Sequence, residues 1–140
     1  MKNIKEIQLS RKITTQLLHL AQISPDKEIC GLIGSVDGRA STCYPITNTA
    51  QQPEIQFQLD EKQQINAMSA MRDRYEQLFA IYHSHPTAPA SPSATDIKLS
   101  AYPAAINLII SLNTKGMLEI KGYKIKQQSV EELYLSLLND

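Results

Sequence analysis

The chain has 140 residues, of which 42% are hydrophobic and 20% are charged. This length and composition argue against a disordered or fibrous protein and suit one hydrophobic core, so we expect residues 1–140 to form a single domain. Fourteen basic residues balance fourteen acidic ones, which argues against the strongly basic surface that grips the phosphate backbone of nucleic acid.

Apolar runs in the sequence are short. Those within residues 104–110 fall far below the roughly 20 residues of a membrane-spanning helix. The charged segment 1–6 is not followed by the apolar stretch and cleavage site of a secretory signal. We therefore expect a cytoplasmic protein without membrane contact. In that reducing compartment Cys30 and Cys43 are expected to be free thiols, buried as small hydrophobic side chains.

The first part of the chain shows strand and helix patterns in turn. Residues 4–9 fit a short strand, and Ser10 can cap a helix whose apolar residues recur at helical spacing. Residues 28–36 have the pattern of a buried strand. The Asp37-Gly38 pair that follows is a strong turn signal and predicts a hairpin with a return strand.

The middle of the chain is predicted to place a loop of unusual composition after a strand. A short strand is expected over residues 57–59. Asp60 can cap the next helix, which we expect to present four apolar side chains on one face: Ile65, Met68, Met71 and Tyr75. Residues 78–83 fit a buried strand, and residues 86–95 contain three prolines before Asp96 opens a short helix.

The remaining segments complete an α/β pattern. Residues 106–112 fit a buried strand, residues 113–116 a turn, and residues 117–125 another strand. Residues 130–138 fit helix and strand templates about equally. Together the elements predict a mixed β-sheet flanked by two or three helices, without repeats or a linker.

Two of the three histidines lie two residues apart, at the end of the strand that begins at residue 78. In an extended chain residues i and i+2 face the same side, so the imidazoles of His83 and His85 can converge on one metal ion. Asp96 is the nearest carboxylate able to complete a set of three ligands, and two histidines with one carboxylate suit catalytic zinc.

Each of these residues also has a purely structural interpretation. A histidine pair at a strand end is often only a polar tip of the core. Ser93 is a good helix N-cap, with Asp96 in the first turn. The complete order makes coincidence much less plausible: His83-x-His85, seven residues, and then Ser93-x-x-Asp96.

This order resembles the signature of the JAMM (MPN) zinc metalloproteases, and all four positions match without a gap. The family also has an essential glutamate upstream, on a strand near the metal, and Glu28 stands at the corresponding place. Without this resemblance, the sequence would favour the interpretation of Glu28 as a surface acid at the head of a strand. The resemblance covers about residues 4–125 and implies a cytidine-deaminase-like α/β fold.

The resemblance also implies roles for the matched residues. His83, His85 and Asp96 would hold one zinc ion, with water as the fourth ligand. Zinc would lower the pKa of that water, and Glu28 would take its proton and pass it to the leaving amine. Ser93 would donate a hydrogen bond to the oxyanion.

The chain, through its minimal size and its segments 28–34, 82–86, 92–96 and 101–103, resembles the prokaryotic stand-alone branch of the family, which is linked to ubiquitin-like (β-grasp) sulfur-carrier proteins. The resemblance then implies cleavage of the amide bond after the carrier's C-terminal glycine, releasing an amino acid such as cysteine. Two alternatives stay open: a general peptidase or small-amide hydrolase, and a non-catalytic MPN scaffold. The substrate carrier and the oligomeric state stay open as well.

Three other classes of protein fit the sequence less well. RadC-like proteins share the H-x-H-P and S-x-x-D patterns, but the balanced charge and the absence of a helix-hairpin-helix extension weigh against them. The H-x-E and P-C-x-x-C segments of the zinc deaminases do not occur. The zincin signature H-E-x-x-H is missing too.

Overall fold

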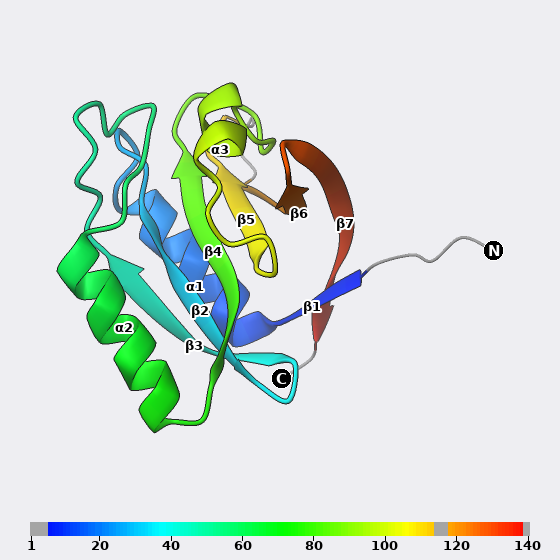
Figure 1. Cartoon of the computed structure of the whole chain (residues 1–140). Coiled ribbons are helices and arrows are strands. Elements are labelled where there is room, and N and C mark those ends of the chain that lie inside the picture. Colours follow the sequence, from blue (N-terminus) through cyan, green and yellow to red (C-terminus); the bar gives the residue numbers. More distant parts are fainter. Residues whose placement is uncertain (1–5, 114–117, 139–140) are drawn as a thin grey trace.

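The computed structural model describes residues 6–113 and 118–138. Within them the chain forms one seven-stranded sheet and three helices (Figure 1). In chain order the elements are β1 (Glu6–Ser10), α1 (Arg11–Gln22), β2 (Cys30–Val36), β3 (Arg39–Ile46), α2 (Glu61–Asp73), β4 (Gln77–His85), α3 (Ala94–Leu99), β5 (Ile106–Ser111), β6 (Glu119–Lys126) and β7 (Ser129–Leu138). Among the described residues no helix is long and apolar enough to cross a membrane.

The sheet is mixed, with strand order β1-β7-β6-β5-β4-β2-β3. The β4–β5 and β1–β7 pairs are parallel, and the other four pairs are antiparallel. The predicted α/β fold with a mixed sheet and two or three helices is therefore confirmed. Parallel pairing of β4 and β5 places the carboxyl ends of both strands at one edge of the sheet, and the histidine pair ends β4 there.

Helix α1 covers one face of the sheet. Ser10 caps it as predicted, since the Ser10 hydroxyl accepts a hydrogen bond from the Ile13 backbone nitrogen at 3.1 Å. The buried side chains of α1 are those of Ile13, Leu17 and Ala21, which follow helical spacing. They pack in one cluster with Tyr82, Leu108 and Ile110 of the strands. This face contains the larger hydrophobic core.

The opposite face carries two smaller clusters. Ala67 and Met71 of α2 pack against Ile81 and its neighbours at one end. At the other end Ala90, from the loop that follows β4, packs against a cluster that includes Ile109 and Tyr123. The polar residues of the motif adjoin both clusters, since Phe57 of the first stacks on His83 and Ile97 of the second follows Asp96 in the chain.

Several local predictions are confirmed. The β2–β3 hairpin turns at Asp37 and Gly38, whose φ angles of 52° and 78° are those of a type I′ turn. Asp60 caps α2 through a hydrogen bond from the Gln63 backbone nitrogen. Both cysteines are free thiols, but Cys43 is only half-buried.

Two predictions about the middle of the chain are wrong. Residues 57–59 form no strand and contribute only an isolated bridge between Leu59 and Asn48, because their backbone bonds to residues 47–49 do not extend into a ladder and the Asn48 side chain takes the Gln58 nitrogen. Ile65 is 61% exposed, and Tyr75 lies beyond α2 with 91% exposure. Only a narrow row of α2 side chains, with Ala67 and Met71 buried, faces the sheet, so the apolar side chains outside this row stay in solvent.

The C-terminal segment resolves the helix–strand ambiguity. It is strand β7, because it fills the position between β1 and β6 and pairs with both. The predicted turn over residues 113–116 falls mainly outside the described residues. The same is true of the start of the first predicted strand, at residues 4–5, and of Met117 in the strand expected over residues 117–125.

Candidate active site

The two motif histidines point to one spot, as their spacing predicts. His83 and His85 are buried at the end of β4, and their Nε2 atoms lie 3.1 Å apart. Asp96 Oδ2 lies 3.0 Å from the Nε2 of His83 and 3.1 Å from that of His85. Tetrahedral zinc, with bonds of about 2.0–2.1 Å, needs ligands about 3.4 Å apart, so little movement separates this cluster from a zinc site.

The orientation of the His85 ring is fixed from outside the cluster. Its Nδ1 lies 2.8 Å from the Pro89 carbonyl oxygen, which can only accept, so Nδ1 carries a proton and Nε2 faces Asp96. Burial alone would lower the pKa of His85, but hydrogen bonds with Asp96 and the Pro89 carbonyl outweigh it and raise the pKa. Burial lowers the pKa of His83. Burial alone would raise the pKa of Asp96, but hydrogen bonds with the two imidazoles outweigh it and hold the pKa low. Neutral imidazoles and an ionised carboxylate are the forms that bind metal.

Asp96 is placed by the start of α3. Ser93 caps this helix: its hydroxyl accepts a hydrogen bond from the Asp96 backbone nitrogen at 3.0 Å, and its own backbone nitrogen donates to Asp96 Oδ2 at 2.9 Å. The predicted cap is confirmed, and it serves the site because it fixes the carboxylate that meets both histidines. The Ser93 hydroxyl retains its own proton for donation.

Glu28 provides a second carboxylate at the site. It is 4% exposed, and the possible ligand atoms of Glu28, His83 and His85 all lie within 4.8 Å of one another. Its Oε1 is buried without a hydrogen-bond partner in the described part of the chain. Since Asp96 Oδ2 lies within 3.1 Å of both Nε2 atoms, Asp96 fits a ligand better, and Glu28 fits a group that handles protons.

Burial raises the pKa of Glu28 to about 7, with His85 opposing the shift and Asp96 adding to it. A carboxyl group with a pKa near the working pH can both accept and return a proton, which is what general acid–base catalysis requires. The interpretation of Glu28 as a surface acid is wrong, because the side chain lies inside the site.

The backbone beside Glu28 is fixed from several sides. The Ser84 hydroxyl accepts a hydrogen bond from the Ile29 nitrogen at 2.8 Å, and the Ser84 nitrogen donates to the Ile29 carbonyl at 3.0 Å. The Glu28 nitrogen donates to the Pro53 carbonyl at 2.7 Å. The middle residue of His83-Ser84-His85 thus holds the segment that carries the glutamate, while its neighbours face the metal position.

Asn48 links Glu28 to the loop over residues 50–59. Its amide nitrogen donates to the Glu28 carbonyl at 3.0 Å and to the Gln56 carbonyl at 2.9 Å. Its Oδ1 accepts from two backbone nitrogens of the loop, those of Ala50 and Gln58. The same loop carries Phe57, whose ring stacks on the His83 imidazole with centroids 4.3 Å apart.

The loop after β4 is held by side chains from the neighbouring strands. Ser111 donates to the Ala88 carbonyl at 2.7 Å, and the Tyr123 hydroxyl donates to the Ala90 carbonyl at 2.5 Å. These bonds flank Pro89, whose carbonyl orients His85. The motif does not predict these supporting residues. Ser84 is the one supporting residue with a sequence signal: strand alternation turns it away from the histidine side, which suggests a different role from that of its neighbours.

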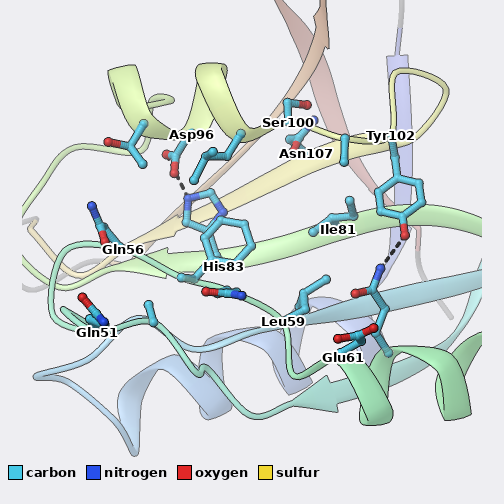
Figure 2. Close-up of a pocket in the computed structure, with 17 residues that line it drawn as sticks. Gln51, Gln56, Leu59, Glu61, Ile81, His83, Asp96, Ser100, Tyr102 and Asn107 are labelled. Atoms are coloured by element: carbon cyan, nitrogen blue, oxygen red, sulfur yellow. Dashed lines mark hydrogen bonds and ion pairs between the residues drawn. The ribbon is translucent and has the colours of Figure 1, made fainter.

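A cavity of about 670 Å³ opens beside the cluster (Figure 2). His83 and Asp96 lie between Gln56 on one side and Ile81 and Asn107 on the other, and Tyr102 lies at the far end beyond Ile81. The loop over residues 50–59 and the ends of α2 and α3 complete the walls. The cavity has room for several residues of an extended chain next to the candidate metal position.

Comparison with known proteins shows the family. Residues 10–125 match the family model described as prokaryotic homologs of the JAB domain, so the chain belongs to this prokaryotic branch of the JAMM/MPN family. The resemblance stated from the motif is confirmed.

Two relatives and one solved structure are similar to the chain over different lengths. The CysO-cysteine peptidase of Mycobacterium tuberculosis is 32% identical over 122 residues, covering 86% of this chain and 82% of that protein. The desampylase of Haloferax volcanii is 33% identical over 89 residues, covering 62% of this chain and 64% of the desampylase. A Desulfitobacterium hafniense protein with a known solution structure has a TM-score of 0.81 and 34% identity, with 95% of this chain and 93% of that chain covered.

Proposed function

We propose that this chain is a zinc-dependent peptidase that cleaves the amide bond after the C-terminal glycine of a ubiquitin-like sulfur carrier in the cytoplasm. The released group would be an amino acid such as cysteine. The observation that carries the proposal is the convergence of two imidazole nitrogens and one carboxylate oxygen within 3.1 Å, with the buried Glu28 beside them. Similarity to a CysO-cysteine peptidase supports the choice of substrate class.

In this proposal His83, His85 and Asp96 hold the metal. A zinc ion there would lower the pKa of a water ligand toward 7 and polarise the carbonyl group of the substrate. Glu28 accepts a proton from the attacking water and returns it to the leaving nitrogen, a task that its pKa of about 7 suits. Ser93 donates a hydrogen bond from its hydroxyl group to the carbonyl oxygen as negative charge develops there.

The cavity supports a substrate with an extended end. A folded carrier cannot enter a space of about 670 Å³, whereas a flexible tail of a few residues can. The tail would lie between the loop over residues 50–59 and the sheet, and it would reach the candidate metal position beside His83 and Asp96. A peptidase without need of a carrier would use the same groups, so the substrate must be tested directly.

The first experiment measures bound metal. Native mass spectrometry of untagged protein, purified without chelators, is expected to show one zinc ion in the wild type and in Glu28→Gln and none in His83→Ala. A wild type that takes up no zinc from excess metal would rule out the metallopeptidase and leave a binding scaffold.

The second experiment identifies the substrate class. The zinc-loaded protein is incubated with a β-grasp carrier extended by cysteine after its terminal glycine, and with a short peptide of the same final sequence. Loss of the mass of one cysteine from the carrier, absent with Glu28→Gln, is the expected result. Equal cleavage of both substrates would favour the general peptidase, and cleavage of neither would overturn the proposed activity.

A further inference from the structure

Asn107 is a buried polar residue without an assigned role. It lies near the start of β5, is 8% exposed, and lines the cavity beside Ile81. Its amide nitrogen is buried and has no hydrogen-bond partner among the residues that the structure describes. A buried amide without a partner is unfavourable for folding, so its presence on a cavity wall points to a partner that arrives with the substrate.

Two other polar side chains around the site, those of Asn48 and Ser111, are fully used by the fold. The amide of Asn48 makes four hydrogen bonds to backbone groups. Ser111, on the same strand and the same face as Asn107, donates to the Ala88 carbonyl and accepts from the Asn113 nitrogen. Among the described residues, the other two buried polar atoms without a partner belong to Glu28 and His83 of the candidate metal cluster, so Asn107 is the case outside that cluster.

The strand register fixes where Asn107 lies along the cavity. In the parallel β4–β5 pair, Ile81 is opposite Asn107 and His83 is opposite Ile109. Asn107 is thus displaced two residues from the row of His83, about 6.6 Å along the strand at about 3.3 Å per residue. An extended substrate has the same rise, so an amide group about two residues from the cleaved bond comes within reach of Asn107.

The lining of the cavity favours the main chain as the recognised group. No lysine or arginine lines it in the described part of the chain, and the carboxylates there belong to Glu61 and Asp96. Most other polar groups are amides and hydroxyls, as at Gln56 and Tyr102. Such walls suit an uncharged extended segment and disfavour acidic side chains.

We propose that Asn107 binds the main-chain amide of the substrate tail about two residues before the cleaved bond, and so sets the register of the tail against the metal. This inference rests on the proposed function, and it adds a residue that acts on substrate binding. The tail, rather than the departing amino acid, is the partner because a single residue would leave most of the cavity empty.

The test compares Asn107→Leu, which keeps the approximate volume and removes the hydrogen bonds, with Asn113→Ala, which changes an exposed asparagine just beyond the same strand. In carrier cleavage Asn107→Leu is expected to raise KM by about 3- to 10-fold, the equivalent of one hydrogen bond, with unchanged zinc content. Its melting temperature is expected to equal or exceed that of the wild type, because a buried unpaired amide is removed. Asn113→Ala should leave both unchanged. A lower melting temperature with unchanged KM would make Asn107 a structural residue and overturn the inference.

A second measurement separates this inference from the proposed function. Acetyl-glycyl-glycine amide is titrated into ¹⁵N-labelled zinc-loaded protein, and the side-chain NH₂ resonance of Asn107 is identified by its loss in Asn107→Leu. A shift of that resonance, with weaker binding of the probe to the variant, supports the inference even if no carrier is cleaved. An unmoved resonance at saturating probe overturns it, whether or not the carrier is a substrate.

Discussion

The two faces of strand β4 carry different kinds of side chain. Ala80, Tyr82 and Ser84 face α1, where buried polar groups are paired: the Tyr82 hydroxyl accepts from the Cys43 thiol, and Ser84 accepts from a backbone nitrogen. His83 and His85 face the cavity side. In the described part of the chain, three buried polar atoms lack partners, and all three belong to this second side: Glu28 Oε1, His83 Nδ1 and Asn107 Nδ2.

This difference indicates that one face of the sheet mainly provides stability and the other mainly provides the chemistry. The α1 face satisfies its polar groups and buries the larger apolar cluster, which is how stability is built. The cavity face keeps buried groups unsatisfied, a local cost that is common where a protein binds or reacts. Substitutions on one face should therefore alter stability and leave the chemistry intact, and those on the other should do the reverse.

The largest expected effect is on activity, at Glu28. Glu28→Gln keeps the shape of the side chain and removes its ability to take a proton, so kcat for carrier cleavage should fall about 10³-fold, with one zinc ion still bound. Steady-state kinetics and native mass spectrometry measure the two quantities. Glu54→Gln, at an exposed glutamate, is the control and should behave as wild type. A loss of less than about tenfold would mean that another group handles the proton.

The next effect is on stability, at the centre of the α1 face. Leu17 is fully buried in the main cluster, and Leu17→Ala should lower the free energy of unfolding by about 2–5 kcal/mol through lost packing and a cavity. Below its melting temperature the variant should keep its zinc and its kcat/KM. Denaturant titration measures the loss, and Leu137→Ala, at a half-exposed position of β7, should cost far less. Lost zinc binding in folded Leu17→Ala would contradict the independence of the two faces.

Metal addition tests the same independence from the other direction. Zinc at about 100 times its Kd should raise the free energy of unfolding by about 2.7 kcal/mol, because it binds only the folded chain. Leu17→Ala, whose free energy of unfolding is lower without zinc, should gain the same increment. Asp96→Asn retains an oxygen for the α3 cap but loses the charged ligand, so it should gain little. Thermal unfolding with and without zinc measures the increments, and an equal gain in Asp96→Asn would exclude Asp96 as a ligand.

Local signals predicted the parts of the structure that depend on neighbours in sequence. The hairpin follows from a residue pair that tolerates positive φ, at Asp37 and Gly38. The helix caps follow from side chains that reach a backbone nitrogen three residues on, as Ser10 and Asp60 do. The alternation of a strand predicted that His83 and His85 share a face.

Contacts between segments far apart in sequence could not be predicted in this way. Residues 130–138 become a strand only because β1 and β6 flank them. Phe57 comes to lie on His83 because Asn48 shapes its loop. The position of Asn107 on the cavity wall depends on the β4–β5 register. Each of these features is decided by tertiary pairing, which a single sequence does not display.

Ser84 is where the two faces meet, and it gives the smallest of the expected effects. Its side chain lies on the α1 side and is fully buried, yet its hydroxyl holds the Ile29 nitrogen next to Glu28. Ser84→Ala leaves that nitrogen unpaired, so the free energy of unfolding should fall by about 1–3 kcal/mol. A displaced Glu28 should also lower kcat by about tenfold with zinc retained.

Chemical denaturation and single-turnover kinetics of Ser84→Ala separate the two losses, with Ser129→Ala, at an exposed serine, as the control that changes neither. If both quantities fall, the α1 face positions the proton-handling group, and the division between the faces has one bridge at Ser84. If stability falls while kcat is unchanged, the Pro53 and Asn48 bonds to Glu28 are sufficient to place it, and the division between stability and chemistry holds without exception along β4.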